Sequence, residues 1–121
     1  MNLSKYLGGQ TSYNEENKAL FKKEGRSYLN KLSKELVKLS PKLKFQTHYN
    51  AGGIACSGEH NLEFSGGEFF FNADCCNSTD NFFAVFRSKD GNKTGNNHIV
   101  KYALFSNPEK LAREIVARLS L

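Results

Sequence analysis

The stretch "IACSGEHNLEFSGGEFFFNADC", residues 54–75, decides the fold because it reads as two strands and the turn that joins them. In residues 54–64, side chains suited to a core alternate with polar ones, which is the two-residue period of a half-buried strand. The "SGG" of residues 65–67 tolerates positive φ, as a hairpin turn requires. The second strand, residues 67–75, follows at once, so the pair is predicted to be antiparallel.

Further strands are predicted on both sides of this hairpin. "KLKFQTHYN" alternates over residues 43–49, and "NFFAVFRS" gives a strand at about 81–88 that is apolar on both faces. "HIVKYALF", residues 98–105, is predicted to be the last strand. Because consecutive strands are joined by short turns, we expect an antiparallel meander of four or five strands.

Two helices flank the predicted sheet. Apolar residues recur every three or four positions before Pro41, at Leu29, Leu32 and Leu36 among others, which predicts a long helix over residues 13–39. Asn107 and Pro108 then mark the start of a shorter helix over residues 108–119. We therefore expect a two-layer α+β fold, residues 1–121 forming a single domain with the helices on one face of the sheet.

The net charge of +5 is unevenly distributed along the 121 residues. Residues 1–45 carry ten Lys or Arg and four acids, residues 46–80 carry five acids and no Lys or Arg, and residues 81–121 carry seven Lys or Arg and three acids. One interpretation is pairing within the sheet, with Glu59 and Glu63 facing Lys44, Arg87 or Lys89 on neighbouring strands. The other is a basic surface for an anionic partner.

The sequence indicates a cytoplasmic protein. No apolar run approaches the roughly 18 residues that a membrane span needs, and the first residues lack the apolar region of a secretory signal. The three Cys residues are an odd number, which fits a disulfide framework poorly. We expect no membrane association and reduced thiols, while a homo-oligomer is left open.

No motif predicts a metal, a cofactor or a catalytic residue. Cys56 and His60 point the same way but lie about 13 Å apart on an extended strand. A zinc site with Cys75 or Cys76 is conceivable, but paired C-x-x-C spacings are absent, and buried thiols are the simpler interpretation. A small hydrolase centred on Glu59, His60 or His98 is kept as an alternative to a non-enzymatic protein.

The segment "RSKDGNKTGNNH", residues 87–98, is longer than a hairpin needs, since two to about five residues suffice. It is either a mobile polar tip or a binding site. Its cations, its neutral hydrogen-bonding groups and its glycine amides suit an anion. The side chains concerned are Arg87, Lys89, Lys93, Thr94, Asn96 and Asn97.

Three segments together resemble a family of small, uncharacterised accessory proteins of tailed phages and prophages. They are "MNLSKYLGGQTS" at residues 1–12, "GGIACSGE" at 52–59 and "FRSKDGNKTGNNH" at 86–98, in the family's order and across nearly the whole chain. The third segment departs from the family's pattern, in which basic residues and Tyr cluster. The matching positions are Gly52, Gly53, Ser57, Gly58 and Glu59, with Arg87, Thr94, Gly95, Asn97 and His98.

The resemblance implies a protein that acts by binding in an infected host. We expect it to counter host defence, by sequestering an anionic nucleotide signal or by blocking a defence protein. The expected ligand-binding residues are Ser57, Glu59, Arg87, Lys89, Lys93, Thr94, Asn97 and His98. The alternative is a small basic nucleic-acid-binding protein that uses Lys18, Lys22, Arg26, Arg87, Lys89 and Lys93.

Overall fold

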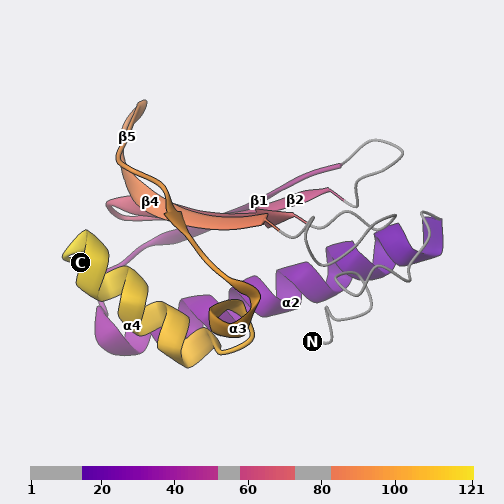
Figure 1. Ribbon diagram of the computed structural model, residues 1–121, viewed down its shortest axis with the longest axis horizontal. Coiled ribbons are helices and arrows are strands. Elements are labelled where there is room, and N and C mark those ends of the chain that lie inside the picture. The colour runs from indigo at the N-terminus through magenta and orange to yellow at the C-terminus, as the bar shows by residue number, and fades with distance from the viewer. Residues whose placement is uncertain (1–14, 52–57, 73–82) are drawn as a thin grey trace.

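The computed structural model describes residues 15–51, 58–72 and 83–121, with side chains from residue 19 onward. One face of an antiparallel sheet is covered by helices, and the other face is turned away from them (Figure 1). The predicted α+β meander is therefore confirmed. None of the described helices is long and apolar enough to cross a membrane.

The sheet is a meander whose strand order follows the chain. Its strands are β1 Phe45–Asn50, β2 Glu59–Phe64, β3 Gly67–Asn72, β4 Phe83–Asp90, β5 Lys93–Thr94 and β6 His98–Ile99. Strands β1 to β5 pair in that order. Strand β6 also pairs with β4, at Val85 and Phe86. Phe64 lies opposite Gly67, so a two-residue turn joins β2 to β3, and Gly66 adopts a φ of 90° there.

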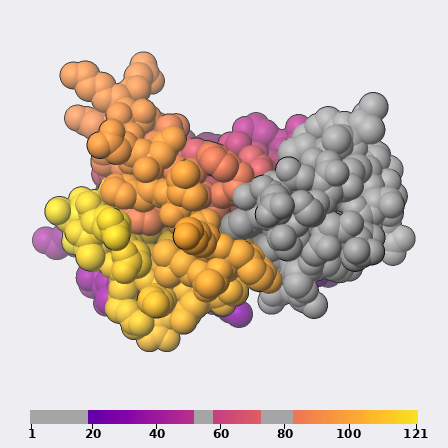
Figure 2. Space-filling view, viewed as in Figure 1, coloured from indigo at the N-terminus to yellow at the C-terminus, as the bar shows by residue number. Residues whose placement is uncertain are grey.

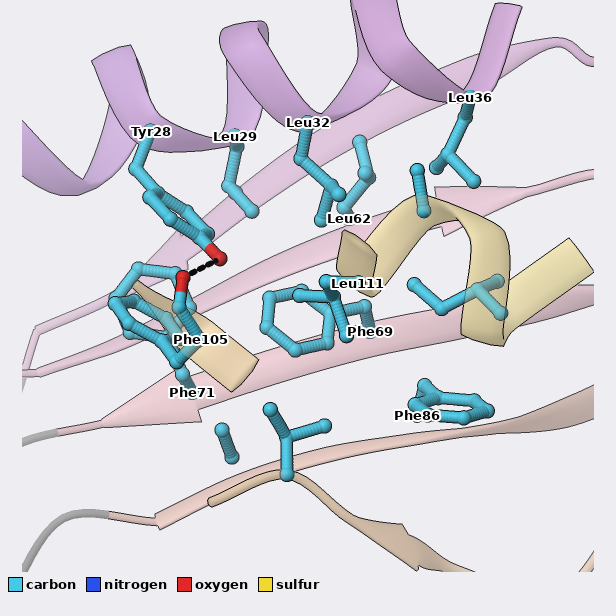
Figure 3. Packing of buried hydrophobic residues seen from close by; sticks show 14 of the residues in the cluster. Tyr28, Leu29, Leu32, Leu36, Leu62, Phe69, Phe71, Phe86, Phe105 and Leu111 are labelled. Atoms are coloured by element: carbon cyan, nitrogen blue, oxygen red, sulfur yellow. Dashed lines mark hydrogen bonds between the residues drawn. The ribbon is translucent and has the colours of Figure 1, made fainter. Parts of the chain in front are cut away.

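The long helix α2, Glu15–Leu39, supplies one half of the core. Its side chains Tyr28, Leu29, Leu32 and Leu36 point at the sheet (Figure 3), and all four are buried. Helix α4, Pro108–Leu119, packs against α2, and its N-cap residue Asn107 accepts a hydrogen bond from the Lys110 amide at 3.1 Å. The bounds of α4 are those expected from the sequence.

The prediction of a strand over residues 98–105 is wrong. Only His98 and Ile99 pair with β4, and the chain then turns into the short helix α3, Tyr102–Phe105. The helical turn carries Phe105 under α2, where its ring stacks on that of Tyr28 with 4.2 Å between centroids. The Tyr28 hydroxyl donates to the Phe105 carbonyl at 2.6 Å (Figure 3). An extended strand would have left this carbonyl and ring at the sheet edge.

The other expected strands differ at their ends. β1 is displaced by one or two residues, and β4 continues to Asp90. The beginning of the strand expected at 54–64 and the end of that expected at 67–75 lie outside the described residues. Residues 93–94, which were expected to be loop, form β5 and extend the β4 hairpin beyond the rest of the sheet, where it projects from the molecular surface (Figure 2).

Candidate functional site

The open face of the sheet, which is turned away from the helices, carries a charge network. Because Phe69 and Phe71 face the core, Glu68, which precedes Phe69, points to the open face, opposite Glu63 on β2 and Arg87 on β4. Two neighbouring carboxylates on one face repel each other unless cations lie between them. Glu68 was not among the residues expected at the site, although the two-residue turn at 65–66 fixes its register opposite Glu63.

The carboxylate of Glu68 is nearly buried and bound by neighbouring side chains. Its side chain is 6% exposed, and its carboxylate accepts hydrogen bonds from Asn61 Nδ2 at 2.9 Å and from Arg87 Nε at 3.3 Å. Lys89 Nζ lies 3.9 Å from Glu68 and 3.4 Å from Glu63 Oε1. Two of the expected ligand-binding cations, Arg87 and Lys89, thus neutralise carboxylates of the protein itself.

His48 and Glu59 complete the polar surface around this network. His48 Nε2 lies 3.0 Å from Glu63 Oε1, but these two atoms lack the angles of a hydrogen bond. Partial burial raises the pKa of the Glu59 carboxyl, and the charge of Glu68 raises it further, while Arg87 acts in the opposite direction. A hollow of about 220 Å³ here is lined by His48, Asn50, Glu59, Asn61, Glu63, Glu68 and Lys89. With three carboxylates and one Lys, it does not suit an anion.

A second hollow, of about 460 Å³, lies beside the β4–β5 hairpin. Its lining consists of Gly66, Ser88, Lys89, Asp90, Lys93, Thr94 and Gly95. Within the described chain, the exposed Lys93 makes no ion pair that would neutralise it, in contrast to Arg87 and Lys89. We call this the hairpin hollow.

The hairpin glycines serve the backbone rather than an anion. Gly91 adopts a φ of 61° at the turn, and a Cβ there would meet nothing within 4 Å. A Cβ on Gly95 would lie 2.1 Å from Ser88 Oγ, so a larger residue there would require the Ser88 hydroxyl to rotate away. The Gly95 amide donates to the Ser88 carbonyl at 2.9 Å. The expectation that the loop glycines leave their amides free is therefore wrong for Gly95.

The structure separates the expected site residues into groups. Glu59, Arg87 and Lys89 share the open face, and Asn97 accepts a hydrogen bond from Arg87 Nη1 at 3.3 Å. Lys93 and Thr94 line the hairpin hollow. His98 lies on the helix-facing side, its ring stacked on Phe86 with 4.8 Å between centroids. Ser57 lies outside the described residues.

No catalytic or metal-binding arrangement joins the three residues of the hydrolase hypothesis. His60 is buried in the core, where its Nε2–H donates to the Phe21 carbonyl at 3.2 Å, while Glu59 points to the open face. Within the described ranges, no three His, Cys, Asp or Glu side chains come together to hold a metal ion. Cys56, Cys75 and Cys76 lie outside these ranges.

A smaller cleft of about 120 Å³ lies between α2 and α3. Its lining residues are Ser27, Tyr28, Lys31, Tyr102, Phe105, Ser106 and Pro108. None of the expected ligand-binding residues lines it. The hairpin hollow is therefore a better candidate, because it gathers Lys93 and Thr94.

The ion pair of Arg87 gives a testable expectation. Replacing Arg87 with Ala should lower the free energy of unfolding by about 1–3 kcal/mol, because a nearly buried carboxylate loses its guanidinium partner. The matched control is Arg113→Ala, which breaks an exposed pair with Glu109 and should change stability by less than about 0.5 kcal/mol. Urea unfolding at pH 7 compares them. If the two variants were equally stable, the ion pair of Arg87 would not be needed for the fold, and Arg87 would again be a candidate ligand-binding residue.

Comparison of the chain with models of protein families, with curated proteins and with solved structures found no match.

Proposed function

We propose that this protein acts by binding, and that the hairpin hollow takes an anionic ligand of the nucleotide class. The observation that carries this proposal is the gathering of Lys93, Thr94 and Ser88 around one open hollow of about 460 Å³, which Lys89 also lines although it pairs with Glu63. Lysine ammonium groups and hydroxyl groups are donors that suit phosphate oxygens. Asp90 is the one carboxylate in the lining.

The position of the hairpin hollow supports ligand capture without chemistry. Lys93 and Thr94 are exposed on a hairpin that projects from the sheet (Figures 1 and 2). Among the described lining residues, the hydroxyl groups of Ser88 and Thr94 make no hydrogen bond to a base that would activate them as nucleophiles. Together with the resemblance to phage accessory proteins, this favours sequestration of a nucleotide signal of host defence. Blocking of a defence protein is the competing possibility.

Thermal melting with a panel of mononucleotides and cyclic nucleotides tests the proposal. One nucleotide class should raise the melting temperature, since a ligand at about 100 times its Kd adds about 2.7 kcal/mol of stability. The variant Lys93→Ala/Thr94→Ala should lose this shift and keep the melting temperature of the unliganded protein, because both side chains are exposed.

The control for this variant is Lys110→Ala, which removes an exposed lysine from α4 and should keep the nucleotide shift. If no nucleotide in the panel raises the melting temperature, the proposal fails. A host protein that co-purifies in stoichiometric amount would then support the blocking function. If the control loses the shift as well, the binding depends on net charge and not on the hairpin hollow.

A further inference from the structure

The outward face of α2 is a basic surface away from the hairpin hollow. Between residues 22 and 38 its exposed charged side chains are all cationic, while the two acids, Glu24 and Glu35, are half-buried. The exposed cations, here called the α2 basic face, are Lys23, Arg26, Lys31, Lys34 and Lys38, whereas the Nζ of Lys22 lies over the Tyr49 ring on β1 at 5.1 Å from its centroid. In Figure 1, α2 lies beneath the sheet, whereas the hairpin projects above it.

The charges of the α2 basic face are compensated less than those of α4. On α4, Arg113 pairs with Glu109 and Arg118 pairs with Glu114, each at 3.0 Å. On α2, the one ion pair among the described side chains joins Lys38 to Glu35 at 3.1 Å. Much of the protein's net positive charge is therefore presented along one side of one helix.

The spacing of these cations suits a linear polyanion. From Lys23 to Lys38 the helix rises by about 22 Å, at 1.5 Å per residue. Arg26, Lys34 and Lys38 follow Lys23 on one broad side of the helix, and the exposed polar residues Ser27 and Asn30 lie between them. A nucleic-acid duplex carries one phosphate per ~1.7 Å of its axis, so a rod of this length meets several phosphates.

We infer that the α2 basic face binds the phosphate backbone of a nucleic-acid duplex. An anionic membrane fits less well, because membrane-surface helices also insert an apolar face, and between residues 22 and 38 the exposed side includes a single large apolar residue, Val37. An acidic protein surface also fits less well, since protein interfaces depend on buried aromatic and apolar anchors. Lysines that contact phosphates read no sequence, so we expect little sequence preference.

The α2 basic face differs from the set of nucleic-acid-binding residues expected from the sequence. Arg26 belongs to the α2 basic face, but Lys22 lies over the Tyr49 ring. Arg87 and Lys89 lie across the sheet and pair with glutamates. The side chain of Lys18 lies outside the described ones. The remaining members, Lys23, Lys31, Lys34 and Lys38, were not expected from the sequence to be a binding group.

Fluorescence anisotropy with a labelled 20-base-pair DNA duplex tests the inference. The full chain should bind at 50 mM salt, and about four phosphate contacts should give a slope near −3.6 in log K against log salt concentration. Lys23→Glu/Lys34→Glu should weaken binding at least about tenfold and reduce the slope by about 1.8, since each lost contact contributes about 0.9.

The charge-matched control is Lys101→Glu/Lys110→Glu, which makes the same change in net charge at exposed positions outside α2 and outside the hairpin hollow. It should retain most of the binding. The inference is overturned if the duplex does not bind at 50 mM salt, if the control weakens binding as much as the α2 variant, or if vesicles of anionic phospholipid bind while the duplex does not. The α2 variant should keep its nucleotide shift, so this inference and the proposed function fail independently.

Discussion

Replacing Gly25 with Ala is expected to destabilise the protein, although alanine is the better helix former by about 1 kcal/mol. Gly25 lies in the middle of α2, and a Cβ at this position would lie 2.1 Å from His60 Nε2. The His60 ring cannot move aside, because it packs against the rings of Phe21, Tyr49 and Phe71 at centroid distances of 5.1, 4.8 and 5.2 Å. We expect a net loss of about 1–3 kcal/mol in the free energy of unfolding.

Urea unfolding of three variants separates this clash from a change in helix propensity. Asn30→Ala, at an exposed position of the same helix, should be neutral or stabilising by up to about 0.5 kcal/mol. In a His60→Ala background, Gly25→Ala should also be neutral or stabilising, because the ring is gone. If Gly25→Ala were as stable as Asn30→Ala in the natural background, the close approach of His60 to the α2 backbone would be wrong.

The sequence could predict those elements whose periodicity is long or whose ends are marked. Leu29, Leu32 and Leu36 reveal the buried side of α2, and Asn107 and Pro108 mark the start of α4. The turn at Ser65 and Gly66 sets the register of β2 and β3. In each case a local signal agrees with the tertiary packing.

The segment 98–105 could not be predicted because short apolar runs fit a strand and a helix equally well. On an extended strand Val100 and Phe105 would point to opposite faces, whereas the observed geometry buries both of them. The helical turn is stabilised because the Phe105 ring and carbonyl both contact Tyr28 on α2, 77 residues away in the chain. Nothing in the local sequence reports such a contact.

The candidate site was predicted in part. The pairing interpretation of the charges is supported for Lys89, which lies 3.4 Å from Glu63. Arg87 pairs with Glu68 instead of Glu59 or Glu63, and this follows from the β3–β4 register. Residues 73–82, which join these strands, lie outside the described ones. A charge run in the sequence shows that cations are present, but only the register shows which of them are already neutralised.

The stability of the protein is expected to fall as the pH decreases from 7 to 5, with His60 responsible for a large share. Burial lowers the pKa of His60 to about 4, and the charges of Arg26 and Lys22 lower it further, while the Phe21 carbonyl acts in the opposite direction. In the unfolded chain the pKa is near 6.5. Between these values the unfolded state binds a proton that the folded state does not, so unfolding becomes easier as the pH falls.

This difference in pKa corresponds to about 3 kcal/mol in total, of which about 2 kcal/mol should be lost between pH 7 and pH 5. The contribution is complete above pH 6.5 and is absent below pH 4. Urea unfolding at several pH values measures this loss. The side chain of His60→Gln cannot be protonated, so the free energy of unfolding of this variant should fall by about 2 kcal/mol less between pH 7 and pH 5 than that of the natural chain. Because the comparison is made between two chains that share every other titrating group, equal losses would mean that the folded protein protonates His60 freely.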